Sequence, residues 1–362
     1  MYSPAIAVVT RETRMQGLLA RWGTKGAAKF RLGAARDHQR SLSSSATRKS
    51  TSADAAALSV QARDSQVAAD FTEYEDEDRN YREALNVLND ELNLGYTVTH
   101  VGREYLANYD FRGCVAVVVV GQDGLVANTA KYVAGVPIIA VNPDSQRIDG
   151  VLLPFRAHQV GQVVKQLLKG NCSVREVTLA QVELNDGQQL LAFNDLFVGC
   201  SGHSSARYTL TVGAKTEPQS SSGMVISTGA GSTGWLSSMF NMYRGMANWI
   251  EPPITMNSRD ENHTSASYSD HSLRLTWEDP KLAWVVREPF RSKQSGVSLV
   301  AGMLDDGEEL VIESLMPSRG VIFSDGVEAD YLEFSSGSIA RIRRAAQRAK
   351  LVFPKTTATV VR

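Results

Sequence analysis

The pattern of hydrophobic and polar positions divides the chain into two parts. Up to about residue 171, short apolar runs alternate with stretches whose apolar residues recur at helical spacing. The expected strands are residues 5–10, 96–101, 115–120 and 136–141, and the expected helices include residues 81–92 and 158–168. The run at 115–120 is almost entirely valine without polar alternation, which predicts a parallel strand buried on both faces. Residues 1–171 are therefore expected to form a doubly wound α/β domain.

After residue 172 the pattern changes to short alternating strands separated by turn residues, such as Asn185-Asp186-Gly187 and Asp305-Asp306-Gly307. The expected strands are residues 174–182, 189–197, 208–212, 223–227, 273–277, 282–286, 309–314, 321–323 and 350–353. This pattern predicts a second, β-rich and sandwich-like domain over residues 172–353, followed by a tail at 354–362.

Residues 41–69 interrupt the first domain. They are rich in Ser, Ala and Thr and contain no aromatic residue, which predicts a flexible insertion or a loosely docked helix. An acidic stretch follows, and we interpret it as the solvated start of a helix, where negative charge is favourable. It consists of Glu73, Glu75, Asp76, Glu77 and Asp78.

Composition and charge exclude several classes of protein. The length of 362 residues suggests two domains. The net charge of -1 gives the chain as a whole no attraction to nucleic acid or acidic membranes. The basic run at 341–350 contains no interleaved aromatic residues, so we interpret it as a solvated or dimer-facing edge. No apolar stretch approaches the roughly 20 residues that span a bilayer. We therefore expect no nucleic-acid partner and no membrane partner.

The cysteines and the first 50 residues are the features that indicate the cellular compartment. Three widely spaced cysteines, Cys114, Cys172 and Cys200, indicate neither a disulfide framework nor a zinc site. The first 50 residues are rich in Arg and Ser like a transit peptide, but residues 5–10 have a strand pattern followed by apolar residues at core-like helical spacing. We expect no targeting segment and a cytoplasmic location.

The turn after the valine strand carries the first candidate chemistry. It reads Gly121-Gln122-Asp123-Gly124, and ligands of parallel sheets gather outside the carboxyl ends of the strands. Gly121 and Gly124 would let backbone amides approach a phosphate, and Asp123 could accept the proton of a hydroxyl during phosphoryl transfer. The alternative is an ordinary strand-to-helix turn in which Asp123 caps a helix over residues 126–134.

Three further sequence patches follow this turn, and their order and spacing along the chain form a pattern together with it. They are Asn194-Asp195 within an apolar strand, a Gly/Ser/Thr loop at 228–238, and Phe323-Ser324-Asp325-Gly326. With supporting segments at 8–14, 141–144 and 286–289, the chain from 5 to 353 resembles the NAD kinase family. It is most similar to the mitochondrial type and its bacterial relatives, in the superfamily of lipid kinases and phosphofructokinases.

This resemblance implies phosphoryl transfer from ATP to the 2′-hydroxyl of the adenosine ribose of NAD, giving NADP. It implies a divalent metal such as Mg²⁺, for which no protein ligand is assigned, and a homodimer or higher homo-oligomer. Asp123 would be the general base, Gly121 and Gly124 would face phosphates, and Asn194 and Asp195 would hold ribose hydroxyls and adenine. The loop at 228–238 would close over the nucleotide through Thr228, Gly231, Ser232, Thr233, Gly234, Trp235 and Ser238. For Trp235, whose ring could stack on the ligand, the alternative is a core aromatic beneath the loop.

Departures from the family pattern keep other functions open. Gln122 and Leu125 replace the second glycine and the threonine of the family's Gly-Gly-Asp-Gly-Thr motif. One alternative is therefore a catalytically impaired NAD-binding protein, and another is a kinase of a different hydroxylated substrate, a lipid or a sugar. The polar pair Asn194-Asp195 favours a nucleotide. Arg11 and Arg14 could neutralise ATP phosphates or could be ordinary surface at a helix start.

Overall fold

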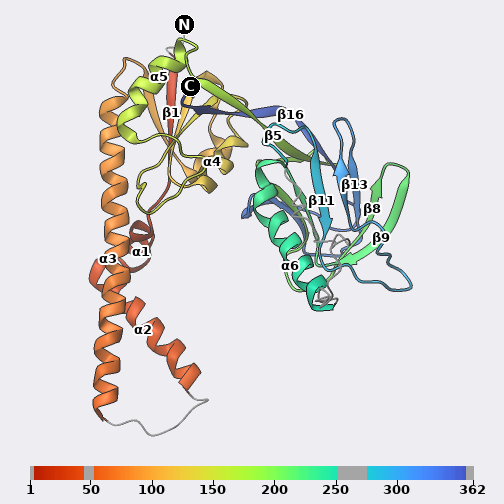
Figure 1. Cartoon of the computed structure of the whole chain (residues 1–362), viewed down its shortest axis with the longest axis horizontal. Helices are drawn as coiled ribbons and strands as arrows, with labels where there is room; N and C mark the ends of the chain where they lie inside the picture. Colours follow the sequence, from red (N-terminus) through yellow and green to blue (C-terminus); the bar gives the residue numbers. More distant parts are fainter. Residues whose placement is uncertain (1–3, 45–52, 251–274, 356–362) are drawn as a thin grey trace, which may run out of the picture. The chain divides into compact units, whose positions relative to one another are not determined.

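The structure is a computed structural model that describes residues 4–44, 53–250 and 275–355 (Figure 1). Its contacts divide the chain into two compact units. Unit 1 comprises Met1–Tyr109, Gly113–Leu125 and Ile139–Cys172, and unit 2 comprises Asp110–Arg112, Val126–Ile138 and Ser173–Arg362. None of the helices in the described residues is long and apolar enough to span a bilayer.

Unit 1 is built on a sheet with the strand order β2-β1-β3-β4. The strands are β1 (Ala5–Thr10), β2 (Thr97–Gly102), β3 (Cys114–Val120) and β4 (Pro137–Val141). β1 pairs in parallel with β2 and with β3. The valines at 117–120 are fully buried, which explains the absence of polar positions in this strand. The four predicted strands of this part are confirmed.

In the part of the chain that the structure describes, the complete α-helices of unit 1 are α1 (Arg14–Trp22), α2 (Lys25–Ser44), α3 (Ala53–Glu91) and α5 (Val160–Leu168) (Figure 1). α1 begins with a capping box in which Thr13 and Gln16 bind each other's backbone N–H groups. Met15, Ala28 and Phe71 form a small core between α1, α2 and α3. Part of the 41–69 segment is thus helical, while residues 45–52 lie outside the described residues, and its flexibility stays a prediction.

The acidic stretch at 73–78 is not a helix start, as the sequence suggested, but lies within α3. The reason is that its carboxylates are neutralised by arginines of neighbouring segments, so they do not need the positive end of a helix dipole. Glu77, for example, pairs with Arg11 at 2.8 Å, and Asp76 pairs with Arg147 at 3.0 Å.

Unit 2 contains two largely antiparallel sheets that enclose one core. One sheet contains β5 (Ser173–Leu184), β6 (Gln189–Ala192), β8 (Ala206–Val212), β9 (Lys215–Ser221), β13 (Leu310–Ser314) and β16 (Ile339–Phe353). The other has the order β12-β11-β10-β7-β14-β15. Its strands are β7 (Asp195–Cys200), β10 (Met224–Ser227), β11 (Leu282–Val286), β12 (Ala301–Leu304), β14 (Gly320–Ser324) and β15 (Val327–Glu333). Inward-facing residues of both sheets, including Tyr208 and Trp284, share a single core. The predicted class, an α/β domain followed by a sandwich-like β domain, is confirmed.

The pattern missed some strands of unit 2. β9 is polar and contains Pro218, which an edge strand tolerates because an edge leaves some N–H groups outside the ladder. β12 and β15 are also absent from the prediction. β16 is 15 residues long although only residues 350–353 were predicted, because its first part consists largely of Ala, Arg and Gln, which favour helices in isolation. Pairing with β5 on one side and β13 on the other overrides that preference.

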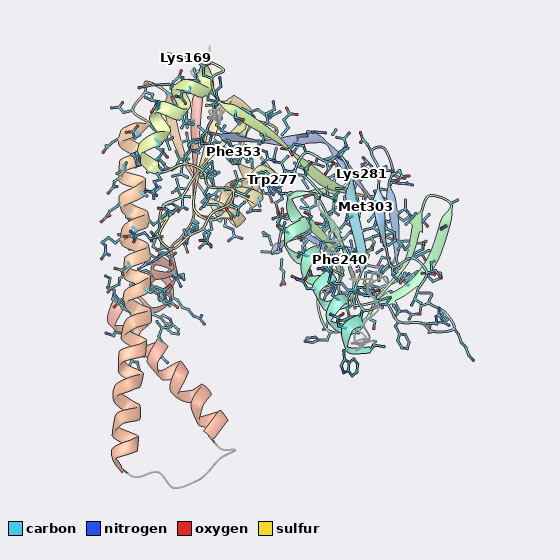
Figure 2. The ribbon with its side chains drawn as sticks, in the orientation of Figure 1. Lys169, Phe240, Trp277, Lys281, Met303 and Phe353 are labelled. Carbon is cyan, nitrogen blue, oxygen red and sulfur yellow. The ribbon has the colours of Figure 1, made fainter. Side chains whose placement is uncertain are left out.

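The strand predicted at 273–277 is wrong where it can be examined. Residues 273 and 274 lie outside the described residues, and 275–277 lead into a turn. The backbone N–H and the hydroxyl of Thr276 both donate to the carboxylate of Asp279, at 2.6 and 3.0 Å, which favours the turn. Trp277 instead packs on Phe353, with ring centres 6.0 Å apart (Figure 2).

Candidate functional site

In unit 1, the turn after β3 fixes the carboxylate of Asp123. Asp123 is the first residue of α4 (Asp123–Ala130) rather than the cap of a helix that begins three residues later. Its two carboxylate oxygens accept hydrogen bonds from the backbone N–H groups of Val151, at 3.1 Å, and Leu152, at 2.9 Å. Each oxygen keeps a further lone pair, so the group is held in place and can still accept a proton or bind a cation.

The two departures in this turn occupy different environments. Gln122 is exposed, as is Gly124, and adds a side chain without disturbing packing. Leu125 is buried beside Gly121, where a Cβ on the glycine would come within 2.8 Å of the Leu125 Cδ2 atom. Leucine therefore fills the space beneath the turn, and a side chain at Gly121 would require the Leu125 side chain to shift.

Arg11 and Arg14 follow β1 and bind α3. Arg11 donates to Glu77 at 2.8 Å, while Arg14 donates to Glu73 at 2.8 Å and also to Glu77. Burial opposes ionisation of Glu77, but the hydrogen bonds from the two arginines outweigh it and lower its pKa. The Tyr81 hydroxyl accepts from the backbone N–H of Arg11 at 3.0 Å and donates to the carbonyl of Val120 at 3.1 Å. These contacts fix the ends of β1 and β3 to α3.

In unit 2, a buried carboxylate organises the Asn194-Asp195 pair. Asp325 and Gly326 form a two-residue hairpin turn between β14 and β15, both at positive φ, 54° and 68°. The Asp325 carboxylate accepts from the backbone N–H groups of Phe193 at 3.1 Å, Asn194 at 2.6 Å and Asp195 at 3.4 Å. It therefore fixes the backbone conformation at the start of β7.

Lys131 neutralises this carboxylate and was missed in the sequence. Its Nζ atom lies 3.8 Å from Asp325 Oδ2 and donates to the Ser324 hydroxyl at 2.8 Å. The two side chains are 1% and 2% exposed, so they form a buried ion pair. Phe323-Ser324-Asp325-Gly326 stood out as a motif, but nothing in the sequence near Lys131 indicates a partner 194 residues away.

Asp195 lies beside this pair and is itself buried. Burial, and secondarily the negative charge of Asp325, raise the pKa of Asp195 to about 7. Because the folded state disfavours the ionised form, the protein loses stability as the pH rises from the ordinary value of 3.8 through about 7.

Asp195→Asn is therefore expected to stabilise the protein above pH 7 and to have a smaller effect at pH 5, where Asp195 is protonated. A pKa shift of this size corresponds to an increase in the free energy of unfolding on the order of 4 kcal/mol at most. Urea unfolding at pH 5 and pH 8 measures it. The exposed Asp186→Asn serves as the control, since Asp186 is ionised at both pH values. A gain for Asp195→Asn that is equal at both pH values would contradict the burial of an ionisable Asp195.

The Gly/Ser/Thr segment after β10 packs on the backbone of Asn194. The Thr228 hydroxyl hydrogen-bonds to the carbonyls of Phe193 at 2.5 Å and Asn194 at 3.2 Å. At Gly231, a Cβ would lie 2.2 Å from the Asn194 carbonyl oxygen, so only glycine fits. The Ser232 hydroxyl donates to the Gly229 carbonyl at 2.7 Å. Thr228, Gly231 and Ser232 are buried.

The loop predicted at 228–238 is shorter than expected, because residues Ala230–Thr233 form a 3₁₀ turn and α6 (Trp235–Ile250) begins soon after it. Thr233, which ends the 3₁₀ turn, and Gly234, which separates it from α6, are exposed. Ser238 lies in the first turn of α6, where its hydroxyl donates to the Gly234 carbonyl at 3.3 Å. The apolar side chains that follow in α6 explain the early start of the helix, because they recur at helical spacing.

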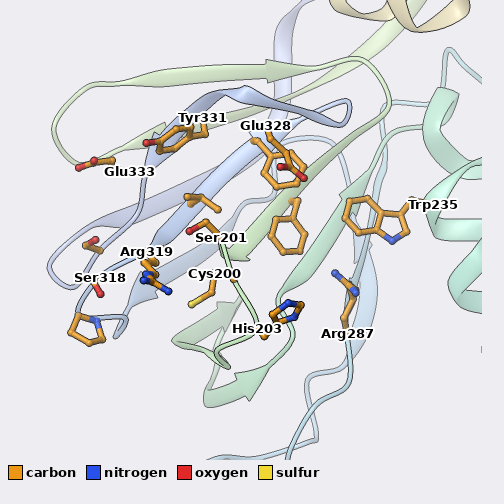
Figure 3. Close-up of a pocket in the computed structure, with 17 residues that line it drawn as sticks. Cys200, Ser201, His203, Trp235, Arg287, Ser318, Arg319, Glu328, Tyr331 and Glu333 are labelled. Carbon is orange, nitrogen blue, oxygen red and sulfur yellow. The ribbon is translucent and has the colours of Figure 1, made fainter. Parts of the chain in front are cut away.

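Trp235 stacks on Phe197, with ring centres 5.5 Å apart and an interplanar angle of 11°. The Arg287 guanidinium lies 5.3 Å from the centre of the Trp235 ring system. Both residues line a cavity of about 760 Å³ in unit 2, with His203, Arg319 and Tyr331 also around it (Figure 3). Trp235 thus has a packing partner within the protein and also borders open space, and its role in stacking on a ligand stays a prediction.

Within unit 2 the structure brings together Asn194, Asp195, Thr228 and Gly231, all of which meet at the backbone that Asp325 holds. Trp235 and Ser238 follow these residues in the sequence and lie in the first turn of α6. Gly121, Asp123 and Gly124 belong to the turn in unit 1.

No protein-family model matches the chain. Among curated proteins it is similar to "NAD kinase 2, mitochondrial" of Rattus norvegicus, with 27% identity over 272 residues, and of Homo sapiens, with 26% over 258 residues. Both of these similar proteins are NAD kinases by name. The matched region covers 59% of this chain and 62% of the rat protein, and 56% and 58% for the human protein. The chain therefore spans less than two thirds of the length of either curated protein. The family resemblance drawn from the motifs is confirmed.

Two solved structures are also similar to the chain. Yeast NADH kinase complexed with NADH has a TM-score of 0.49 and 13% identity, over 72% of this chain and 68% of that chain. An NAD kinase from Archaeoglobus fulgidus in complex with ATP has a TM-score of 0.47 and 15% identity, over 76% of this chain and 89% of that chain.

Proposed function

We propose that the protein is an NAD kinase, which transfers the terminal phosphoryl group of ATP to the 2′-hydroxyl of the adenosine ribose of NAD and yields NADP. The observation that carries this proposal is the similarity to two curated NAD kinases. Two of the motifs that indicated the family, the Asp123 turn and the Asn194-Asp195 segment, are each held by hydrogen bonds between a carboxylate and backbone N–H groups.

Asp123 is the proposed general base. The ribose 2′-hydroxyl would give its proton to a free lone pair of the Asp123 carboxylate while its oxygen bonds to the γ-phosphorus. The bond from that phosphorus to the bridging oxygen breaks, and ADP leaves. Phosphoryl transfer depends mainly on positioning and charge neutralisation, so a carboxylate fixed by two backbone N–H groups suits this role.

The donor set at Asp123 also fits Mg²⁺. The described residues contain no cluster of three or more His, Cys, Asp or Glu side chains suited to a metal, but Mg²⁺ commonly binds through one or two carboxylates together with substrate phosphates. The free lone pairs of Asp123 could supply such a ligand. When bound, the ion would neutralise charge on the phosphates of ATP.

The proposed NAD contacts lie in unit 2. Asn194 and Asp195 would hold the ribose hydroxyls and adenine, and Asp325 with Lys131 would keep their backbone in place. Thr228, Gly231 and Ser232 would act by packing on that backbone, whereas the exposed Thr233, Gly234 and Ser238 could contact the nucleotide directly. We also propose a homodimer or higher homo-oligomer and a cytoplasmic location.

The test is to incubate the purified protein with NAD, ATP and Mg²⁺ and to detect NADP with an NADP-specific dehydrogenase. Formation of NADP at a rate proportional to enzyme concentration is the expected result. Binding of NAD without formation of NADP would instead support an impaired NAD-binding protein. In that case the double variant Gln122→Gly and Leu125→Thr, which restores the family's turn, should gain activity.

A further inference from the structure

A small cavity in unit 1 lies beside the Asp123 turn. It measures about 110 Å³, and its lining combines three arginines with carboxylates: Arg11, Arg14, Arg147, Glu73, Glu77 and Asp144. Gln122 of the turn and Tyr81 of α3 also line it. A water occupies about 30 Å³ in the liquid, so the cavity as it stands holds only a few waters.

The arginines converge from two segments, the end of β1 and the loop after β4, and all of them bind α3. Arg11 and Arg14 pair with Glu77 and Glu73, and Arg147 pairs with Asp76 at 3.0 Å. Because Glu73, Asp76 and Glu77 have i, i+3 and i+4 spacing, they lie on one face of the helix. One face of α3 thus supplies carboxylate oxygens to all three guanidinium groups.

The third carboxylate that lines the cavity is Asp144. Asp144 accepts from the Asn80 side-chain amide at 2.9 Å and its backbone N–H donates to Asn142 at 3.0 Å, while Arg147 is more distant, at 3.9 Å. Asp144 therefore fixes the loop after β4 against Asn80 of α3. Glu73 and Glu77 of α3 line the cavity with the arginines, whereas Asp76 binds Arg147 from outside the lining.

Arg11 retains an unused donor here. Its Nε atom is buried and has no hydrogen-bond partner among the described residues. A buried donor without an acceptor is unfavourable, so this N–H would gain from an additional oxygen. A Cβ on Gly121 would lie 3.8 Å from Arg11 Cδ, which places the arginine directly beside the turn.

We propose that this arginine cavity binds the phosphate chain of the phosphoryl donor, and that Glu73, Asp76 and Glu77 of α3 are internal competitors that occupy the arginines until the donor displaces them. Guanidinium groups bind phosphate and carboxylate oxygens with the same paired geometry, so one can replace the other. A polyphosphate offers more oxygens than the carboxylates and could also satisfy Arg11 Nε. The identity of the ligand as the donor rests on the proposed function.

The test is calorimetric binding of inorganic tripolyphosphate, and of ATP, to the full chain without NAD or metal. Glu77→Gln removes one competitor and should lower the Kd by about fivefold or more, the effect of losing an ion pair worth about 1 kcal/mol. Arg11→Gln should raise the Kd by a similar factor or more. Glu75→Gln is the matched control, because Glu75 lies on the same helix and pairs with Lys25 instead, and its Kd should stay within about twofold of the wild type.

Glu77 helps to hold α3, so Asp76→Asn provides a second variant with an exposed ion pair and a smaller expected decrease in Kd. If neither variant binds tripolyphosphate more tightly than Glu75→Gln does, the competitor role is wrong. If Arg11→Gln binds as tightly as the wild type, the cavity is not the site. Both measurements omit NAD and turnover, so they give the same answer whether or not the protein forms NADP.

Discussion

Asp123→Asn is expected to abolish NADP formation while NAD affinity stays within a few-fold of the wild type. The amide cannot accept the ribose proton, and general-base catalysis typically contributes about 10²–10⁴-fold to a rate. Its oxygen can still accept from one of the two backbone N–H groups, Val151 or Leu152, but its NH₂ group faces the other. Turnover with saturating ATP and NAD measures the first effect, and calorimetry with NAD measures the second.

Asp110→Asn is a matched control for this experiment. Asp110 is exposed and pairs with its neighbour Arg112, whose hydrogen bonds lower the pKa of Asp110 to about 2. This substitution should leave turnover unchanged. Activity of Asp123→Asn within about tenfold of the wild type would exclude Asp123 as the base. A large drop in melting temperature for Asp123→Asn alone would show that the carboxylate mainly holds the loop at 151–152.

The sequence predicted best where one local property decides the structure. The valines of β3 have no polar alternation, so burial on both faces was evident, and the glycines after them marked the turn. Prediction failed where distant pairing decides. The arginine-rich sequence of β16 is compatible with a helix or with a solvated strand edge, because it does not show which residues pair with it. In the structure Arg341 pairs with Glu309, and Arg344 pairs with Asp306.

The same reason explains what was missed in the candidate site. Asp123, Asn194 and Asp195 became candidates because a carboxylate after a buried strand and a polar pair within an apolar strand are evident in the local sequence. The arginine partners of Glu73, Asp76 and Glu77 are not visible in this way, since they lie about 60–70 residues away in the chain. The acidic stretch was therefore interpreted as a helix start although it lies within α3.

Lys131→Met is expected to reduce the free energy of unfolding by about 3–5 kcal/mol. Loss of one partner of a buried ion pair leaves an uncompensated charge, here the carboxylate of Asp325, and that charge is costly in a site shielded from water. Burial already raises the pKa of Asp325, and the ammonium group of Lys131 opposes that rise. Without the lysine the carboxylate should protonate at higher pH, so the loss of stability should shrink as the pH is lowered.

Urea unfolding at pH 8 and pH 5 tests this expectation, with Lys281→Met as the matched control. Lys281 (Figure 2) pairs with Asp305 at 2.8 Å, but the two side chains are 49% and 63% exposed, so solvent screens the pair and it contributes little to stability. Equal losses for the two variants would contradict a buried, compensated Asp325. Because Asp325 also holds the backbone of Asn194, Lys131→Met should weaken NAD binding even where the protein remains folded. Lys281→Met should not, which separates support of the proposed nucleotide site from general stability.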